Sequence, residues 1–134
     1  MAVRAFLRKL GAALRRDTPA FTDSALLSSR GARLARVDLH DAVLPQADLR
    51  GADLQDADLR HADLHEANLR RADLRGADLE GTDLVNAQMA KVRLSRSTYD
   101  DATKWPPSLA DSIHRRSTEL QPGVFQVTED FVAP

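Results

Sequence analysis

The sequence has no cysteine, few aromatic residues and no long hydrophobic run, and each lack excludes a class of protein. Without cysteine the chain cannot form a disulfide scaffold, bind zinc through thiolates or use thiol chemistry, and this composition suits a cytoplasmic protein. Aromatic residues make up only 4% of the chain, so small and aliphatic side chains must build the core. No apolar run approaches the roughly 20 residues that span a bilayer.

Charged residues are common, but the two signs are balanced. Lysine and arginine number 19 against 20 aspartates and glutamates, which leaves a net charge of -1 at pH 7. No overall field therefore attracts nucleic acid or an anionic membrane, and we expect no direct binding to nucleic acid. Any function that depends on charge must come from a local patch.

A five-residue repeat dominates the middle of the sequence. Leucine recurs at every fifth residue from Leu34 to Leu84, and Met89 and Leu94 continue the series to thirteen repeats. A small residue, mostly alanine, stands two positions before each of them, and aspartate usually stands between the two. The repeat therefore reads Ala-Asp-Leu-x-x.

A period of five fits neither a regular helix nor a flat strand. Five helical steps of about 100° turn the next leucine by about 140°, which scatters the leucines around the cylinder. In a strand, side chains alternate with period two, so an odd spacing sends successive leucines to opposite faces. To keep leucine and alanine inside, the chain must turn by a constant angle every five residues and wind into a solenoid.

Residues 32–96 resemble the pentapeptide-repeat family, in which four such repeats form one square coil. The resemblance implies an all-β fold, a right-handed quadrilateral β-helix of about three coils of 20 residues each. It also gives the expected domain organisation. We divide the chain into an N-terminal helix and linker over residues 1–26, the solenoid over 27–106, and a C-terminal cap or dimerisation segment over 107–134.

Both flanks of the repeat carry patterns suited to capping. Near the start, apolar residues follow helical spacing, which predicts an amphipathic helix that either caps the solenoid or lies on an anionic membrane. These residues are Val3, Phe6, Leu7, Leu10 and Leu14.

After the repeats, residues 99–106 resemble the segment that closes pentapeptide-repeat domains, with Tyr99 and Trp105 in place of leucine. We expect a short helix over 108–114. Two strands, over 117–120 and 124–127, are expected to flank a Pro-Gly turn. This segment either caps the solenoid or forms a homodimer.

Residues at the same position in successive repeats are first expected to have structural roles. The aspartate before each leucine can accept a hydrogen bond from a backbone amide two residues on and so close the corner. Coils of 20 residues would stack Asp38, Asp58 and Asp78, and Arg60 would offset their repulsion. The same geometry puts Arg50, Arg70, Arg71 and Lys91 on one face. That basic face is either ordinary solvated surface or a site for an acidic partner.

No catalytic, cofactor-binding or metal-binding site is predicted. His61 and His65 have the spacing of a helical metal pair, but in a solenoid successive repeats lie on different faces. We therefore expect a non-enzymatic protein-protein interaction or scaffold module whose partner is unknown. The resemblance implies one alternative, a DNA mimic that binds a type II topoisomerase (gyrase) and protects it from quinolones. A second alternative is a peripheral membrane protein that uses the N-terminal helix.

Overall fold

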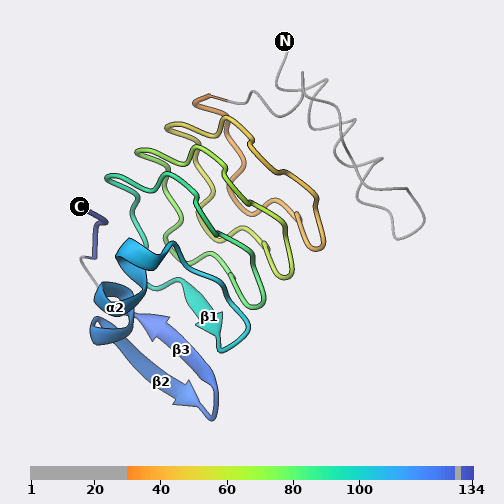
Figure 1. Ribbon diagram of the computed structural model, residues 1–134. Helices are drawn as coiled ribbons and strands as arrows, with labels where there is room; N and C mark the ends of the chain where they lie inside the picture. The colour runs from red at the N-terminus through yellow and green to blue at the C-terminus, as the bar shows by residue number, and fades with distance from the viewer. Residues whose placement is uncertain (1–29, 129–130) are drawn as a thin grey trace.

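The chain winds into a stack of coils that ends in a small C-terminal sheet and helix (Figure 1). The computed structural model describes residues 30–128 and 131–134, so the helix expected near the N-terminus lies outside the described residues. Parallel bridges join residues 20 apart, from Arg33 with Asp53 to Asp78 with Thr98. Because the sequence repeat is five residues, each turn of the stack contains four repeats.

Backbone hydrogen bonds hold each coil to the next. The amide of Asp53 donates to the carbonyl of Ala32 at 2.8 Å, and the amide of Leu34 donates to the carbonyl of Asp53 at 2.7 Å. The same pair of bonds recurs along the stack, so coils contact mainly their immediate neighbours. Repeats in the middle of the stack are thus fixed by ladders above and below them.

The leucine and alanine columns form the interior, as the period predicted. Leu54, Leu64 and Leu74 are fully buried, and so are Ala47 and Ala67. Thr82 replaces alanine at one fully buried position, where its hydroxyl donates to the carbonyl of Leu59 at 2.8 Å. Ser97, the other buried polar residue in this column, is satisfied in the same way, because its hydroxyl donates to the carbonyl of Leu94 at 2.7 Å.

The aspartate before each leucine closes the corner, as predicted. The Asp58 carboxylate accepts a hydrogen bond from the amide of Arg60 at 3.1 Å, and the same contact to the residue two positions on occurs along the column. Asn68 does the same for Arg70 at 3.3 Å. Asparagine can therefore replace aspartate here without loss of the turn.

The last residue of each repeat lies in the left-handed backbone region, which the sequence did not reveal. Its φ is 60° at Arg36 and 65° at Arg96, and glycine takes the position in three of the thirteen repeats, at Gly51, Gly76 and Gly81. Glycine adopts this conformation without steric cost, whereas other residues are strained in it. The corner thus stores a small strain that the ladders of hydrogen bonds outweigh.

Alanine substitutions at two of these glycines should differ in cost. A Cβ at Gly51 (φ 66°) meets nothing within 4 Å, so Gly51→Ala should cost only the backbone strain, about 1 kcal/mol. A Cβ at Gly81 would collide with the imidazole of His61 one coil away, so Gly81→Ala should cost about 1 kcal/mol more. Urea unfolding followed by circular dichroism checks the order, and equal losses would contradict the stacking of His61 on Gly81.

The final turn contains one additional residue. Asp78 pairs with Thr98, but Asp83 pairs with Lys104, 21 residues on. The Thr103 hydroxyl donates to the carbonyl of Leu79 at 2.8 Å at the point of the insertion. The shift aligns Trp105 with the leucine column of Leu84.

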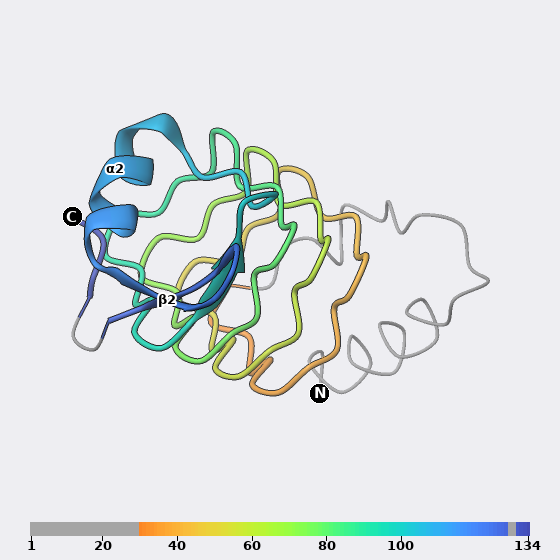
Figure 2. The same ribbon diagram turned by 90° about the horizontal axis from the view of Figure 1, so that it is seen from below.

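The helix and the hairpin predicted after the repeats are present, and a third strand from the last coil, which was not predicted, joins the hairpin in an antiparallel sheet. Strand β1 spans Thr98–Asp100, helix α2 spans Pro107–Arg115, and strands β2 and β3 span Ser117–Gln121 and Val124–Val127. The sheet order is β1-β3-β2, and the turn between β2 and β3 contains Gly123 with a φ of 78°. Figure 2 shows α2 and β2 gathered at one end of the stack.

The C-terminal residues add a further antiparallel pairing along the last coil. The amide of Lys91 donates to Ala133, that of Leu94 to Phe131, and that of Arg96 to Val127, at 2.9, 3.2 and 2.9 Å. Phe131 and Ala133 are buried by this pairing, whereas Leu120 on the outer strand β2 is 56% exposed. The homodimer suggested for this segment stays a prediction.

Candidate interaction face

The structure puts the four basic residues of the predicted face side by side on successive coils. The amide of Gly51 donates to the carbonyl of Arg70 at 2.9 Å, which sets Arg50 and Arg70 in one column. The amide of Arg71 donates to the carbonyl of Ala90 at 2.9 Å, so Lys91 follows Arg71 in the adjacent column. The four residues thus lie close together, but they do not have the same surroundings.

Arg50 is already engaged by a carboxylate of its own repeat. Its guanidinium donates twice to Asp48, from Nε at 2.7 Å and from Nη2 at 2.6 Å. Arg30 approaches the same carboxylate at 3.8 Å. A bidentate pair of this kind fixes the side chain, so Arg50 has little capacity for another anion.

The same pairing recurs wherever arginine stands two residues after aspartate. Arg60 donates to Asp58 at 2.9 and 2.6 Å, and Arg75 donates to Asp73 at 2.8 and 2.7 Å. The hydrogen bond from Arg60 is the main reason why the pKa of Asp58 is lowered. Burial raises the pKa of Asp73, but the hydrogen bonds and charge of Arg75 lower it by more. Arg60 also lies 3.7 Å from Asp78, which offsets the repulsion expected in that column.

Arg70 lacks such a partner because Asn68 replaces aspartate in its repeat. Asn68 keeps the corner hydrogen bond but carries no charge. Within residues 30–128 and 131–134, no carboxylate lies within 4.0 Å of the side-chain nitrogens of Arg70, Arg71 or Lys91, and all three residues are exposed. The structure therefore reduces the predicted set of four cations to three unpaired ones, Arg70, Arg71 and Lys91, which we call the basic face.

Acid should destabilise the solenoid through these ion pairs. The pKa values of Asp58 and Asp73 are lowered in the folded chain, so the unfolded chain binds their protons more tightly. Their stabilisation is complete above the ordinary carboxylate range and is lost as the pH falls through and below about 4. Burial and nearby carboxylates raise the pKa of Glu80, which opposes this trend.

Urea unfolding at a series of pH values checks this prediction. Arg60→Ser should make the acid loss shallower, because Asp58 then titrates in the folded chain nearer its ordinary range. Arg70→Ser removes the same charge without breaking an ion pair and should leave the pH profile unchanged. A wild-type profile that is flat into strongly acidic solution would contradict the account of the pairs.

A shallow cleft of about 320 Å³ borders the basic face. Coil residues form one side of it, and the start of α2 forms the other. The lining residues are Arg70, Ala87, Gln88, Met89, Ala90, Ser108, Leu109 and Pro134. The cleft gives the face an apolar margin next to its charges.

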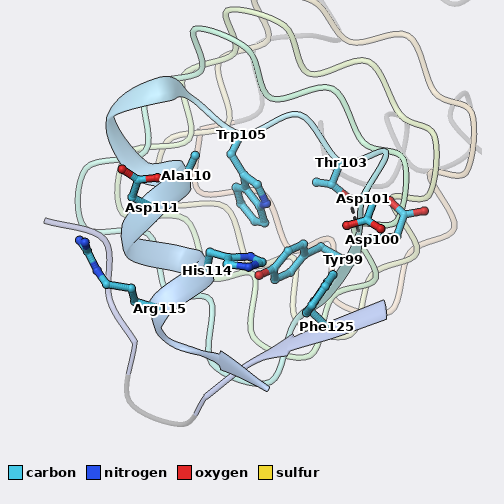
Figure 3. Close-up of a pocket in the computed structure, with 10 residues that line it drawn as sticks. All are labelled: Tyr99, Asp100, Asp101, Thr103, Trp105, Ala110, Asp111, His114, Arg115 and Phe125. Carbon is cyan, nitrogen blue, oxygen red and sulfur yellow. Dashed lines mark hydrogen bonds between the residues drawn. The ribbon is translucent and has the colours of Figure 1, made fainter. Parts of the chain in front are cut away.

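A second cleft, of about 370 Å³, lies between the end of the coils and α2 (Figure 3). Its rings pack at right angles or in stacks: the centroids of Tyr99 and Trp105 are 5.3 Å apart at 86°, and those of Tyr99 and Phe125 are 5.4 Å apart at 24°. His114 on α2 lies 5.3 Å from Phe125. Sequence reasoning gave these aromatic residues a capping role only and did not foresee the cleft that they line.

Two searches of the described residues were negative. Among residues 30–128 and 131–134, no group of three or more histidine and acidic side chains is arranged to hold a metal ion. None of the helices in this part of the chain has the length and apolar character to cross a membrane.

The repeat geometry agrees with a known family. The family model for pentapeptide repeats matches two overlapping stretches, residues 32–71 and 62–98. The chain belongs to the pentapeptide-repeat family. Its members form right-handed β-helices and are generally non-catalytic repeat modules.

Solved structures of other pentapeptide-repeat proteins are similar to this chain. The protein alr5209 from Nostoc PCC 7120 is 33% identical over 81% of this chain and 90% of its own, with a TM-score of 0.51. Rfr23 from Cyanothece 51142 is 30% identical over 56% and 54% of the two chains, with a TM-score of 0.37. A protein of the Arabidopsis thaliana thylakoid lumen is 32% identical over 57% and 55%, with a TM-score of 0.38. Comparison with curated proteins found no match.

Proposed function

We propose that this pentapeptide-repeat protein, as a right-handed β-helix of about three coils, is a non-enzymatic interaction module whose basic face binds an acidic segment of a protein partner. One observation carries the proposal. Arg50, Arg60 and Arg75 are each neutralised by an aspartate of the same repeat, whereas Asn68 leaves Arg70 unpaired. The face therefore keeps its positive charge, since no carboxylate of the described residues pairs with Arg70, Arg71 or Lys91.

The spacing of the face suits an extended acidic peptide. Successive coils lie one strand spacing apart, about 4.8 Å, so Arg71 and Lys91 present their charges at a short, fixed interval. Arg70 and Arg71 have guanidinium groups that can each bind a carboxylate in bidentate fashion. The adjoining cleft at Met89 and Leu109 offers apolar contact beside these charges.

The acidic columns do not favour the DNA-mimic alternative. A DNA mimic needs a continuous run of unneutralised negative charge. Here Arg60 pairs with Asp58, Arg75 pairs with Asp73, and Lys104 donates to Asp83 at 3.1 Å. The acid columns are thereby interrupted by cations, and this supports the basic face as the better candidate.

Affinity capture with matched variants tests the proposal. The first variant, Arg70→Ser/Arg71→Ser/Lys91→Ser, removes the basic face. The control, Arg33→Ser/Arg36→Ser/Arg96→Ser, removes the same charge from a different face of the solenoid. That face is the one formed by the repeats of Leu34 and Leu94. We expect the proteins captured by the wild type to be lost with the first variant and retained with the control.

The captured proteins are then tested one at a time with purified components. Binding through the basic face should weaken as salt is raised, because salt screens exposed charges. If the wild type and the first variant capture the same proteins with the same salt dependence, the proposal is wrong.

A further inference from the structure

The cleft between the last coil and α2 gathers aromatic residues that are rare elsewhere in the chain. The sequence has a single tryptophan and a single tyrosine, and Trp105 and Tyr99 both line this cleft. Independently of the basic face, we propose that it binds a basic side chain, arginine or lysine, presented by a peptide segment of a partner.

The walls of the cleft have the form that attracts a cation. The rings of Trp105 and Tyr99 stand almost perpendicular, at 86°, and Phe125 stacks on Tyr99 from β3. Trp105 and Phe125 are only half-buried, so both contribute surface to the cleft. The negative face of an aromatic ring, and of tryptophan above all, attracts an ammonium or guanidinium group.

Carboxylates stand on both sides of these rings (Figure 3). Asp100 and Asp101 lie at the end of β1, and Asp111 lies across the cleft on α2. Asp100 is held in place by the amides of Gly81 at 2.8 Å and Ala102 at 3.1 Å. In the described part of the chain, none of the three carboxylates forms a salt bridge.

The one cation that lines the cleft does not neutralise it. Arg115 belongs to the lining, but Figure 3 shows its guanidinium turned away from Tyr99 and Trp105. The charge nearest the rings is therefore set mainly by Asp100 and Asp101, because Asp111 lies on the same side of α2 as Arg115. A positively charged ligand is favoured over a neutral one of the same shape.

Two buried polar atoms in the wall, the Tyr99 hydroxyl and the Trp105 Nε1, also lack hydrogen-bond partners in the described structure. Tyr99 is only 4% exposed, and its hydroxyl forms no hydrogen bond in the described structure. The nearby Ser117 hydroxyl donates instead to the carbonyl of Ile113 at 2.7 Å. Figure 3 shows the Tyr99 hydroxyl directed toward the ring of His114. The His114 side chain is exposed, and it must shift for a cation to reach the Tyr99 hydroxyl. Buried hydroxyls are normally hydrogen-bonded, and a guanidinium or ammonium N-H would supply the missing donor.

Fluorescence of Trp105 tests the proposal directly, because it is the only tryptophan and lies in the cleft. The probes are N-acetyl-arginine amide, N-acetyl-lysine amide and the uncharged N-acetyl-citrulline amide, which has nearly the shape of the arginine probe. We expect a saturable change in emission with the arginine or lysine probe and none with citrulline. Choline, added as a separate probe, distinguishes a site for free quaternary amines from one for basic side chains, and saturation by choline alone would overturn the proposal.

Charge variants separate specific binding from a general salt effect. Asp101→Asn/Asp111→Asn should weaken binding of the cationic probe about fivefold, since each exposed carboxylate contributes modestly. Asp41→Asn/Asp56→Asn removes the same charge from exposed corners away from the cleft and should leave the affinity unchanged.

A second measurement does not depend on Trp105 fluorescence. It follows the chemical shift of the Trp105 indole N-H in NMR spectra as each probe is added. Equal responses to the arginine and citrulline probes, or unchanged affinity in the cleft variant, would overturn the proposal. The basic-face variant Arg70→Ser/Arg71→Ser/Lys91→Ser should still bind the cationic probe, so this site and the proposed function can fail separately.

Discussion

Replacing Leu64 by alanine should lower the free energy of unfolding by about 3 kcal/mol. Leu64 is fully buried, and it lies between Leu44 and Leu84 in one column of the stack. The coils above and below are held by backbone hydrogen bonds, so they cannot move in to fill the space. The cavity should therefore stay open, and its cost adds to the lost burial of the side chain. Urea unfolding followed by circular dichroism measures the loss.

Val85 provides the control because it follows Leu84 but faces outward and is only half-buried. Val85→Ala should change stability by no more than about 0.5 kcal/mol. A cost below about 1 kcal/mol for Leu64→Ala would mean that the leucine column is not the tightly packed core inferred here.

Replacing Tyr99 by alanine should cost about 3 kcal/mol and should loosen the last coil. The Tyr99 ring is buried against Trp105 and Phe125, and these rings close the end of the leucine stack. Without the Tyr99 ring, the pairing of Leu94 with Phe131 loses support from the cap. Urea unfolding gives the total loss, and hydrogen exchange at the Leu94 amide reports whether the last coil opens first.

Tyr99→Phe is the matched control, because it keeps the ring and removes only the unpartnered hydroxyl. A buried hydroxyl without a partner does not stabilise the fold, so this variant should be as stable as the wild type or slightly more stable. If Tyr99→Ala leaves exchange at Leu94 and Leu84 unchanged, the aromatic residues do not serve as the cap.

The sequence allowed the repeating part of the fold to be predicted because burial imposes a strict period on it. Leucine and alanine at fixed positions must face inward, and aspartate closes each corner by a contact only two residues long. The left-handed corner could not be predicted in the same way. Residues as different as Arg36, Asp56 and His61 occupy it, since hydrogen bonds between coils, not side-chain type, impose the conformation.

The last turn and the aromatic cleft depend on contacts that no period encodes. Counting by 20 from Asp83 leads to Thr103, whereas the structure pairs Asp83 with Lys104. The cleft joins residues of β1, α2 and β3, and these elements come together only when the cap folds. The sequence predicted the helix and the hairpin, but it did not indicate that they pack against Tyr99.

The basic face was predicted only in part because charges were counted without regard to pairing. Arg50 and Arg70 are equivalent in the repeat, and they differ only because Asp48 precedes one and Asn68 precedes the other. That difference is visible in the sequence once the bidentate pair two residues apart is known. It then identifies which arginine is available for a partner.

Asn68→Asp tests this account most directly, because it changes one charge and keeps the corner hydrogen bond. The new carboxylate should pair with Arg70 as Asp48 pairs with Arg50, and the free energy of unfolding should change by no more than about 0.5 kcal/mol. The measurement is the dissociation constant for a partner captured by the wild-type basic face. We expect it to rise about fivefold in the variant. An unchanged dissociation constant would contradict the claim that the unpaired charge of Arg70 makes this face a binding site.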